Sequence, residues 1–148
     1  MTKRIAVLAS GRGSTFQAVI DAIAAGRVPA RCVGLITDNP KAYAIERARN
    51  AGIPVSVLDY ASFPSKKEYE AALLAAMRER EADLFVLAGY MRILGVPIVQ
   101  AFSGRIMNIH PALLPSFTGL HGQRQAVQYG VKVAGCTVTG VPCAHSPC

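Results

Sequence analysis

Acidic residues are missing from a large part of this sequence. Only 9 of its 148 residues are Asp or Glu, against 16 Lys and Arg, and none follows Asp83. Any acid–base chemistry in residues 84–148 must therefore depend on histidine. The net charge of +7 suits anionic partners, but the basic residues are scattered and are not interleaved with aromatic side chains, which argues against nucleic acid. We expect small anionic molecules as ligands.

Cysteines and long apolar runs are also scarce. The apolar stretch at residues 84–99 contains Arg92 and Pro97 and is too short for a membrane span. With no export signal at the N-terminus, this predicts a cytoplasmic protein without a membrane segment. The histidines and cysteines lack the compact spacing of metal ligands, so we predict no metal site. The cysteines are too few and too unevenly spread for a disulfide framework, which predicts reduced thiols at Cys32, Cys136, Cys143 and Cys148.

Short β-branched runs alternate with helical patterns along the chain. Strands separated by helices predict an α/β fold with a Rossmann-like, mostly parallel sheet and flanking helices. Ser14 with Gln17, and Ser65 with Glu68, have the spacing of capping boxes at helix starts. Ligands should bind at the carboxyl ends of the strands, where the loops at 10–15, 89–94 and 108–121 gather. The predicted strands cover residues 4–9, 32–37, 54–58, 84–88 and 105–109.

Gly11 and Gly13 lie between the first predicted strand and a helix. A helix start in this position offers unpaired N–H groups and a partial positive charge, which predicts a phosphate site. A tight turn that binds nothing explains the same glycines. A dinucleotide site would need a third glycine where the chain has Phe16, although Asp38 at the end of the second strand could stand for its ribose-binding acid.

Asn108 and His110 are two residues apart near the end of the last predicted strand, just before Pro111. Because side chains alternate along a strand, both should lie on one face at its carboxyl edge. An amide can donate a hydrogen bond to an oxygen that gains charge in acyl transfer, and histidine can hold or deliver a proton. The pair is therefore typical of a site where an amine attacks a carbonyl. A structural role for buried polar residues is the alternative, and His121 is equally ambiguous.

Three stretches, "LASGRGSTFQAVIDA", "VLAGYMRIL" and "GRIMNIHPALLPSFTGLHGQRQAV", closely resemble the glycinamide ribonucleotide formyltransferase family. The resemblance runs from about Arg4 to Val138. It implies transfer of a formyl group from 10-formyltetrahydrofolate to the amine of 5'-phosphoribosylglycinamide in purine biosynthesis, without a metal. Thr15 replaces the family's usual asparagine. The resemblance implies phosphate binding by Gly13, Ser14 and Thr15, folate binding by Lys66, Met91, Arg92, Ile93, Leu94 and Asn108, and catalysis by Asn108 and His110.

The family's third catalytic group, an aspartate after a "GCTVH" strand, has no counterpart here. This chain has Thr139 in place of that histidine and continues as "TGVPCAHSPC" without a carboxylate. We therefore expect an incomplete formyltransferase-like domain at residues 1–138, lacking the family's C-terminal strands and helix, and an irregular tail at 139–148. Catalysis should be strongly reduced, and exposed apolar surface should favour a homo-oligomer.

Two alternatives to this function stay open from the sequence. One is an inactive module that binds phosphate or a nucleotide, which predicts ligand binding without turnover. The other is a nicotinamide-dependent dehydrogenase, against which Phe16 argues.

Overall fold

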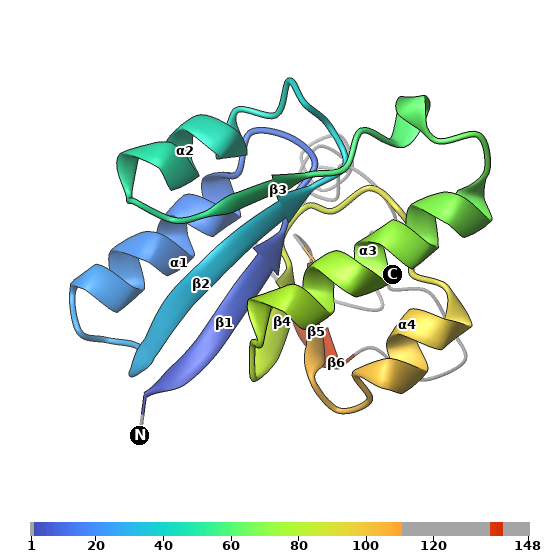
Figure 1. Ribbon diagram of the computed structural model, residues 1–148. Coiled ribbons are helices and arrows are strands. Elements are labelled where there is room, and N and C mark those ends of the chain that lie inside the picture. Colours follow the sequence, from blue (N-terminus) through green and yellow to red (C-terminus); the bar gives the residue numbers. More distant parts are fainter. Residues whose placement is uncertain (1, 111–136, 141–148) are drawn as a thin grey trace, which may run out of the picture.

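The computed structural model describes residues 2–110 and 137–140 of the chain. Strands and helices alternate along it as the sequence predicts (Figure 1), and the five predicted strands each lie within two residues of an observed one. The elements are β1 (Lys3–Leu8), α1 (Ser14–Ala24), β2 (Ala30–Thr37), α2 (Ala44–Asn50), β3 (Val55–Val57), a 3-10 turn η1 (Tyr60–Ser62), α3 (Lys66–Arg80), β4 (Leu84–Leu87), α4 (Val96–Ala101), β5 (Ile106–His110) and β6 (Thr137–Gly140).

The strands form one sheet in the order β3-β2-β1-β4-β5-β6. The pairs from β3 to β5 are parallel, and β6 runs antiparallel to β5. The predicted Rossmann-like, mostly parallel sheet with flanking helices is therefore confirmed. Because β1 has β2 on one side and β4 on the other, the chain reverses its direction of winding between β1 and β4. Such a switch point is where open α/β sheets bind ligands.

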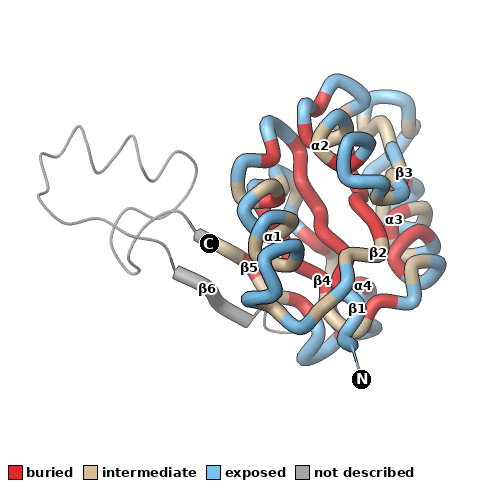
Figure 2. The backbone as a smooth tube through the Cα atoms, turned by 90° about the vertical axis from the view of Figure 1, so that its left-hand side faces the viewer, coloured by how far each residue is buried: buried red, intermediate tan, exposed pale blue. Residues whose placement is uncertain are grey.

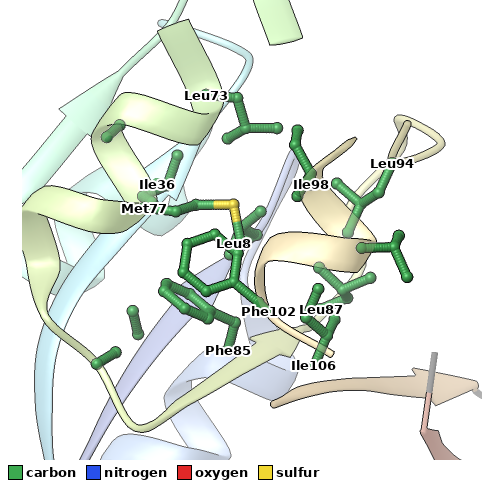
Figure 3. Packing of buried hydrophobic residues seen from close by; sticks show 14 of the residues in the cluster. Leu8, Ile36, Leu73, Met77, Phe85, Leu87, Leu94, Ile98, Phe102 and Ile106 are labelled. Carbon is green, nitrogen blue, oxygen red and sulfur yellow. The ribbon is translucent and has the colours of Figure 1, made fainter. Parts of the chain in front are cut away.

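Apolar side chains of the strands alternate between the two faces of the sheet. In β1, Ile5 and Val7 pack on the face covered by α1 and α2, whereas Ala6 and Leu8 pack toward α3 and α4. The strands are consequently the most buried layer of the molecule (Figure 2). The larger cluster, on the α3 and α4 side (Figure 3), includes Leu8, Ile36, Leu73, Met77, Phe85, Leu87, Ile98, Phe102 and Ile106.

The two predicted helix starts have different outcomes. Ser65 is the N-cap of α3, and its Oγ accepts a hydrogen bond from the backbone N–H of Glu68 at 3.2 Å, as the spacing predicts. The prediction for Ser14 is wrong, because the N-cap of α1 is Gly13 and Ser14 is the first helical residue. The side chain of Gln17 does not fold back on the helix start but donates to Asp21.

Thr139 and Gly140, which we expected in an irregular tail, instead end β6, where Thr139 stands opposite Asn108. Residues 141–148 lie outside the described residues.

Of the four cysteines, the structure describes Cys32, which is a free thiol whose pKa is raised by burial. Cys136, Cys143 and Cys148 lie outside the described residues. Within residues 2–110 and 137–140, no helix is long and apolar enough to cross a membrane.

The contrast between the two serines predicts unequal effects on stability. Ser65→Ala removes a cap hydrogen bond and should lower the free energy of unfolding by about 1 kcal/mol. Ser14→Ala removes no cap and should change it by less than about 0.5 kcal/mol. Urea denaturation followed by circular dichroism measures the free energy of unfolding of both variants. An equal loss in the two would contradict the finding that only Ser65 caps its helix.

Candidate functional site at the carboxyl edge of the sheet

Ser10 joins the two loops that leave the sheet at its switch point. Its backbone N–H donates to the carbonyl of Gly89 at 3.3 Å, and its carbonyl accepts from Asn39 Nδ2 at 3.2 Å. Its Oγ accepts from the backbone N–H of Met91 at 2.8 Å. Ser10 is buried, so these bonds are shielded from water. The glycine loop after β1 and the loop at residues 89–94 are therefore held edge to edge.

The glycine loop is shaped by its contact with α2. Gly13 has a φ of 74°, a left-handed conformation that favours glycine. A Cβ at this position would lie 2.7 Å from Ala44 Cβ, closer than any side chain allows. The backbone N–H of Ala44 donates to the carbonyl of Gly11 at 3.1 Å. The first turn of α1 has no side-chain cap, so no capping side chain occupies its N–H groups, and phosphate binding by Gly13, Ser14 and Thr15 stays a prediction.

The loop at residues 89–94 borders a hollow that contains most of the predicted folate residues. Lys66, from the start of α3, lines it together with Met91, Arg92 and Ile93. Leu94 is buried in the core instead and anchors the end of the loop. The hollow has a volume of about 220 Å³, and its other walls are Tyr60, Tyr69, Glu70 and Leu73.

A larger groove lies beside this hollow, between α3 and α4. Its volume is about 510 Å³, and Ala71, Leu74, Pro97 and Ile98 contribute its apolar lining. Lys66 and Glu70 line both spaces, whereas Lys67 lines only this groove. The two neighbouring lysines therefore occupy different environments although they share one helix start.

Arg92 is fixed from two sides. Its Nε donates to Asp38 Oδ2 at 2.8 Å, and its guanidinium lies over the ring of Tyr60, 3.7 Å from the ring centroid. The Asp38 side chain is only 3% exposed and the Arg92 side chain is 41% exposed. One carboxylate oxygen of Asp38 is therefore bonded to a cation, and the other, Oδ1, is buried. This leaves the ribose-binding role that a dehydrogenase would require of Asp38 without support.

Two tyrosine hydroxyls meet under the same loop. The hydroxyl of Tyr69 forms a hydrogen bond with that of Tyr90. Burial raises the pKa of Tyr69 to about 12, and it raises the pKa of Tyr90 as well. Both groups are therefore neutral at physiological pH, so that one donates to the other. The rings of Tyr60 and Phe63 contact Tyr69 edge-on, which makes this wall of the hollow rigid and aromatic.

The predicted catalytic residues belong to β5. Asn108 is 8% exposed, and its Cα pairs with Leu87 of β4 on one side and with Thr139 of β6 on the other. His110 is the last residue of β5 and pairs with Thr137. Because β4 separates β5 from β1, the chain places these two positions beside the 89–94 loop and one strand further from the glycine loop. His121 lies outside the described residues.

Several supporting residues were not anticipated from the sequence. Ser10 joins the two loops, Tyr60 and Tyr90 contribute contacts of the 89–94 loop, and Arg47 of α2 donates to the carbonyl of Arg12 in the glycine loop. Asp38 pairs with Arg92 and not with a ribose. The rule that loops gather at the carboxyl edge could have indicated Ser10 and Asp38, but no sequence signal pairs Asp38 with Arg92 across the switch point. Among the described residues there is no group of three or more His, Cys, Asp or Glu side chains that could hold a metal ion.

Comparison with known proteins agrees with this geometry. Residues 3–142 match the family described as formyl transferase. The match covers nearly the whole chain, which therefore belongs to the formyl transferase family.

Within the family, the chain is similar to enzymes of purine synthesis. It is 43% identical to the phosphoribosylglycinamide formyltransferase of Bacillus subtilis, over 92% of this chain and 70% of the relative. It is 46% identical to the trifunctional purine biosynthetic protein adenosine-3 of Drosophila pseudoobscura, over 92% of this chain but only 10% of that protein. The crystal structure of glycinamide ribonucleotide transformylase 1 from Symbiobacterium toebii matches with a TM-score of 0.88 and 48% identity, over 97% of this chain and 68% of that one.

The unequal exposure of Asp38 and Arg92 predicts unequal costs of breaking their ion pair. Arg92→Met leaves a buried carboxylate without its cation and should lower the free energy of unfolding by about 2 kcal/mol, a value reduced for the partial exposure of the arginine. Asp38→Asn leaves a cation that water can reach and should cost about 1 kcal/mol. Equilibrium unfolding at pH 7 compares them, and a larger loss for Asp38→Asn would contradict this account.

Proposed function

We propose that this chain transfers a formyl group from 10-formyltetrahydrofolate to the amine of 5'-phosphoribosylglycinamide, a step of purine biosynthesis. The observation that carries the proposal is the connection at Ser10. It holds an anion-binding loop and an aromatic hollow side by side at the switch point, next to the strand that bears Asn108 and His110. A phosphorylated amine and a flat, carboxylate-bearing formyl donor require such an arrangement. The similarity to phosphoribosylglycinamide formyltransferases supports the same assignment.

The glycine loop is the proposed phosphate site. The N–H groups of Gly13, Ser14 and Thr15 lie at the positive end of the 11-residue helix α1, where a phosphate is stabilised by hydrogen bonds and by the helix dipole. The hydroxyls of Ser14 and Thr15 add further donors. The left-handed backbone at Gly13 allows the loop to turn without a side chain that would cover these N–H groups.

The hollow beside the 89–94 loop fits the formyl donor. Tyr60, Tyr69 and Leu73 supply flat and apolar walls for a ring system, and Met91 and Ile93 supply exposed apolar side chains at its mouth. Lys66, at the rim, carries a charge that complements the carboxylates of a folate. Arg92 is held by Asp38 and Tyr60, so its main role is to fix the shape of the loop. We propose no metal for this chemistry.

Asn108 and His110 are the proposed catalytic groups. When bound, 10-formyltetrahydrofolate supplies the electrophilic formyl carbon. As the amine attacks, a C–N bond forms and the formyl oxygen gains negative charge, which the Asn108 amide and a protonated His110 stabilise by donating hydrogen bonds. The bond between the formyl carbon and the folate nitrogen then breaks. The proton lost by the amine passes to that nitrogen, and His110 is suited to hold it during the transfer.

The two lysines at the start of α3 allow a test of the proposed folate site, because Lys66 lines the hollow and Lys67 does not. Lys66→Gln should raise the KM for 10-formyltetrahydrofolate about fivefold, as expected for the loss of an exposed ion pair with the ligand. Lys67→Gln is the matched control, because Lys67 does not line the hollow, and it should change this KM by less than about twofold. Steady-state kinetics with each substrate varied in turn measures these KM values. An equal change in the KM for 10-formyltetrahydrofolate in both variants would contradict the assignment of Lys66.

Catalysis and substrate binding should separate at His110. His110→Ala should lower kcat by between about 100-fold and 10 000-fold, the usual contribution of a general acid–base group. The upward shift of the melting temperature by 5'-phosphoribosylglycinamide should be unchanged, because a ligand that binds only the folded state stabilises it by an amount set by the ratio of its concentration to its dissociation constant. Formyl transfer at the wild-type rate in this variant would remove His110 from the mechanism. Binding without turnover in the wild-type chain would instead favour the phosphate-binding module.

A further inference from the structure

Arg47 of α2 packs directly against the glycine loop. Its Nε donates to the carbonyl of Arg12 at 2.7 Å, and its Nη1 donates to Gln17 Oε1 at 3.4 Å. Its Cδ lies 3.4 Å from where a Cβ on Gly13 would be. Gln17 in turn donates to Asp21 Oδ1 at 2.9 Å. One side chain thus bonds to the loop residue before Gly13 and to the first turn of α1, and it lies beside Gly13.

These contacts determine the direction of the loop's peptide groups. The carbonyl of Gly11 accepts from the backbone of Ala44, and the carbonyl of Arg12 accepts from Arg47. In a planar trans peptide, the C=O and the following N–H point in opposite directions. With both carbonyls turned toward α2, the N–H groups of Arg12 and Gly13 point away from it. Neither N–H has a hydrogen-bond partner in the part of the chain that the structure describes, which leaves both able to bind an anion.

The charge of Arg47 is also uncommitted. The ion pairs among the described residues do not include Arg47. Arg49, two positions further along the same helix, pairs with Glu46 on the exposed surface. The two arginines of this short helix therefore differ in two respects: Arg47 contacts the glycine loop and has no acidic partner among the described residues, whereas Arg49 is paired with Glu46.

We infer that Arg47 is a positioning residue for the phosphate of the amine substrate: it turns the Arg12 carbonyl toward α2, so that the loop N–H groups face the ligand, and adds an uncompensated positive charge beside them. This inference rests on the proposed function and extends its phosphate site to α2. It differs from a purely structural role, in which Arg47 would only hold α2 in place through its contacts with Tyr43 and the loop.

The test compares two ligands that differ only in the phosphate. Isothermal titration of the whole chain with 5'-phosphoribosylglycinamide and with its unphosphorylated riboside gives a ratio of dissociation constants that reports phosphate recognition. Arg47→Met should weaken binding of the phosphorylated ligand on the order of tenfold, the usual effect of losing a charge-assisted hydrogen bond, and should leave riboside binding unchanged. Arg49→Met removes the same charge from the same helix and should keep the wild-type ratio.

Arg47→Lys gives a second, milder test. Lysine keeps the charge but cannot donate to Arg12 and Gln17 together in the planar geometry of a guanidinium, so this variant should bind the phosphorylated ligand several-fold more weakly than the wild type. If Arg47→Met shows no cooperative melt, Arg47→Lys serves as the test in its place. A wild-type ratio of the two dissociation constants in a folded Arg47 variant would overturn the inference and leave the proposed function standing. A wild-type chain that binds neither ligand would overturn the proposed function, and the inference with it.

Discussion

The site depends on the hydrogen bonds of one buried serine. Ser10 follows β1 and is hydrogen-bonded to the backbone at two positions near the start of the 89–94 loop, Gly89 and Met91. This is geometrically feasible because β1 and β4 are paired in the sheet, so that their carboxyl ends lie at the distance of one hydrogen bond. Two loops from distant parts of the sequence thereby become a single surface, with the proposed phosphate site on one side and the aromatic hollow on the other.

Each helical layer supports one of these two regions. On the face covered by α1 and α2, the glycine loop is held through the carbonyls of Gly11 and Arg12. On the opposite face, α3 supplies Tyr69 and Lys66 to the hollow, and the turn before it supplies Tyr60. Asp38, at the end of β2, reaches across the switch point to Arg92. The sheet therefore separates the two proposed ligand sites, which come together only at its carboxyl edge.

Much of the fold could be predicted from the sequence because its signals are periodic and local. The β-branched runs located five strands, and the Ser65–Glu68 spacing located the start of α3. The same spacing failed at Ser14, because the close approach of α2 requires a glycine at the cap position and shifts the helix start by one residue. A tertiary contact thus outweighed a local preference, which no pattern within the helix could have indicated.

The site was less predictable for a similar reason. The resemblance to the family directed attention to Gly13, to Lys66 and to the 91–94 stretch, and the structure places Lys66 beside Met91, Arg92 and Ile93 in one hollow. The residues that hold them come from elsewhere: Asp38 is 54 positions from Arg92 and Arg47 is 35 positions from Arg12. Pairings over such separations depend on strand order, which the alternation of strands and helices does not specify.

The contact between Gly13 and Ala44 has a consequence for how this protein can be redesigned. With no side chain at residue 13 and only a methyl group at residue 44, which is fully buried, the loop and α2 have no spare space between them. The two positions must therefore vary together, and a new side chain at either one moves the helix as well as the loop. To adapt the proposed anion site to a differently shaped ligand, α2 would have to be moved as a unit. Sequence changes in the loop alone would give little freedom.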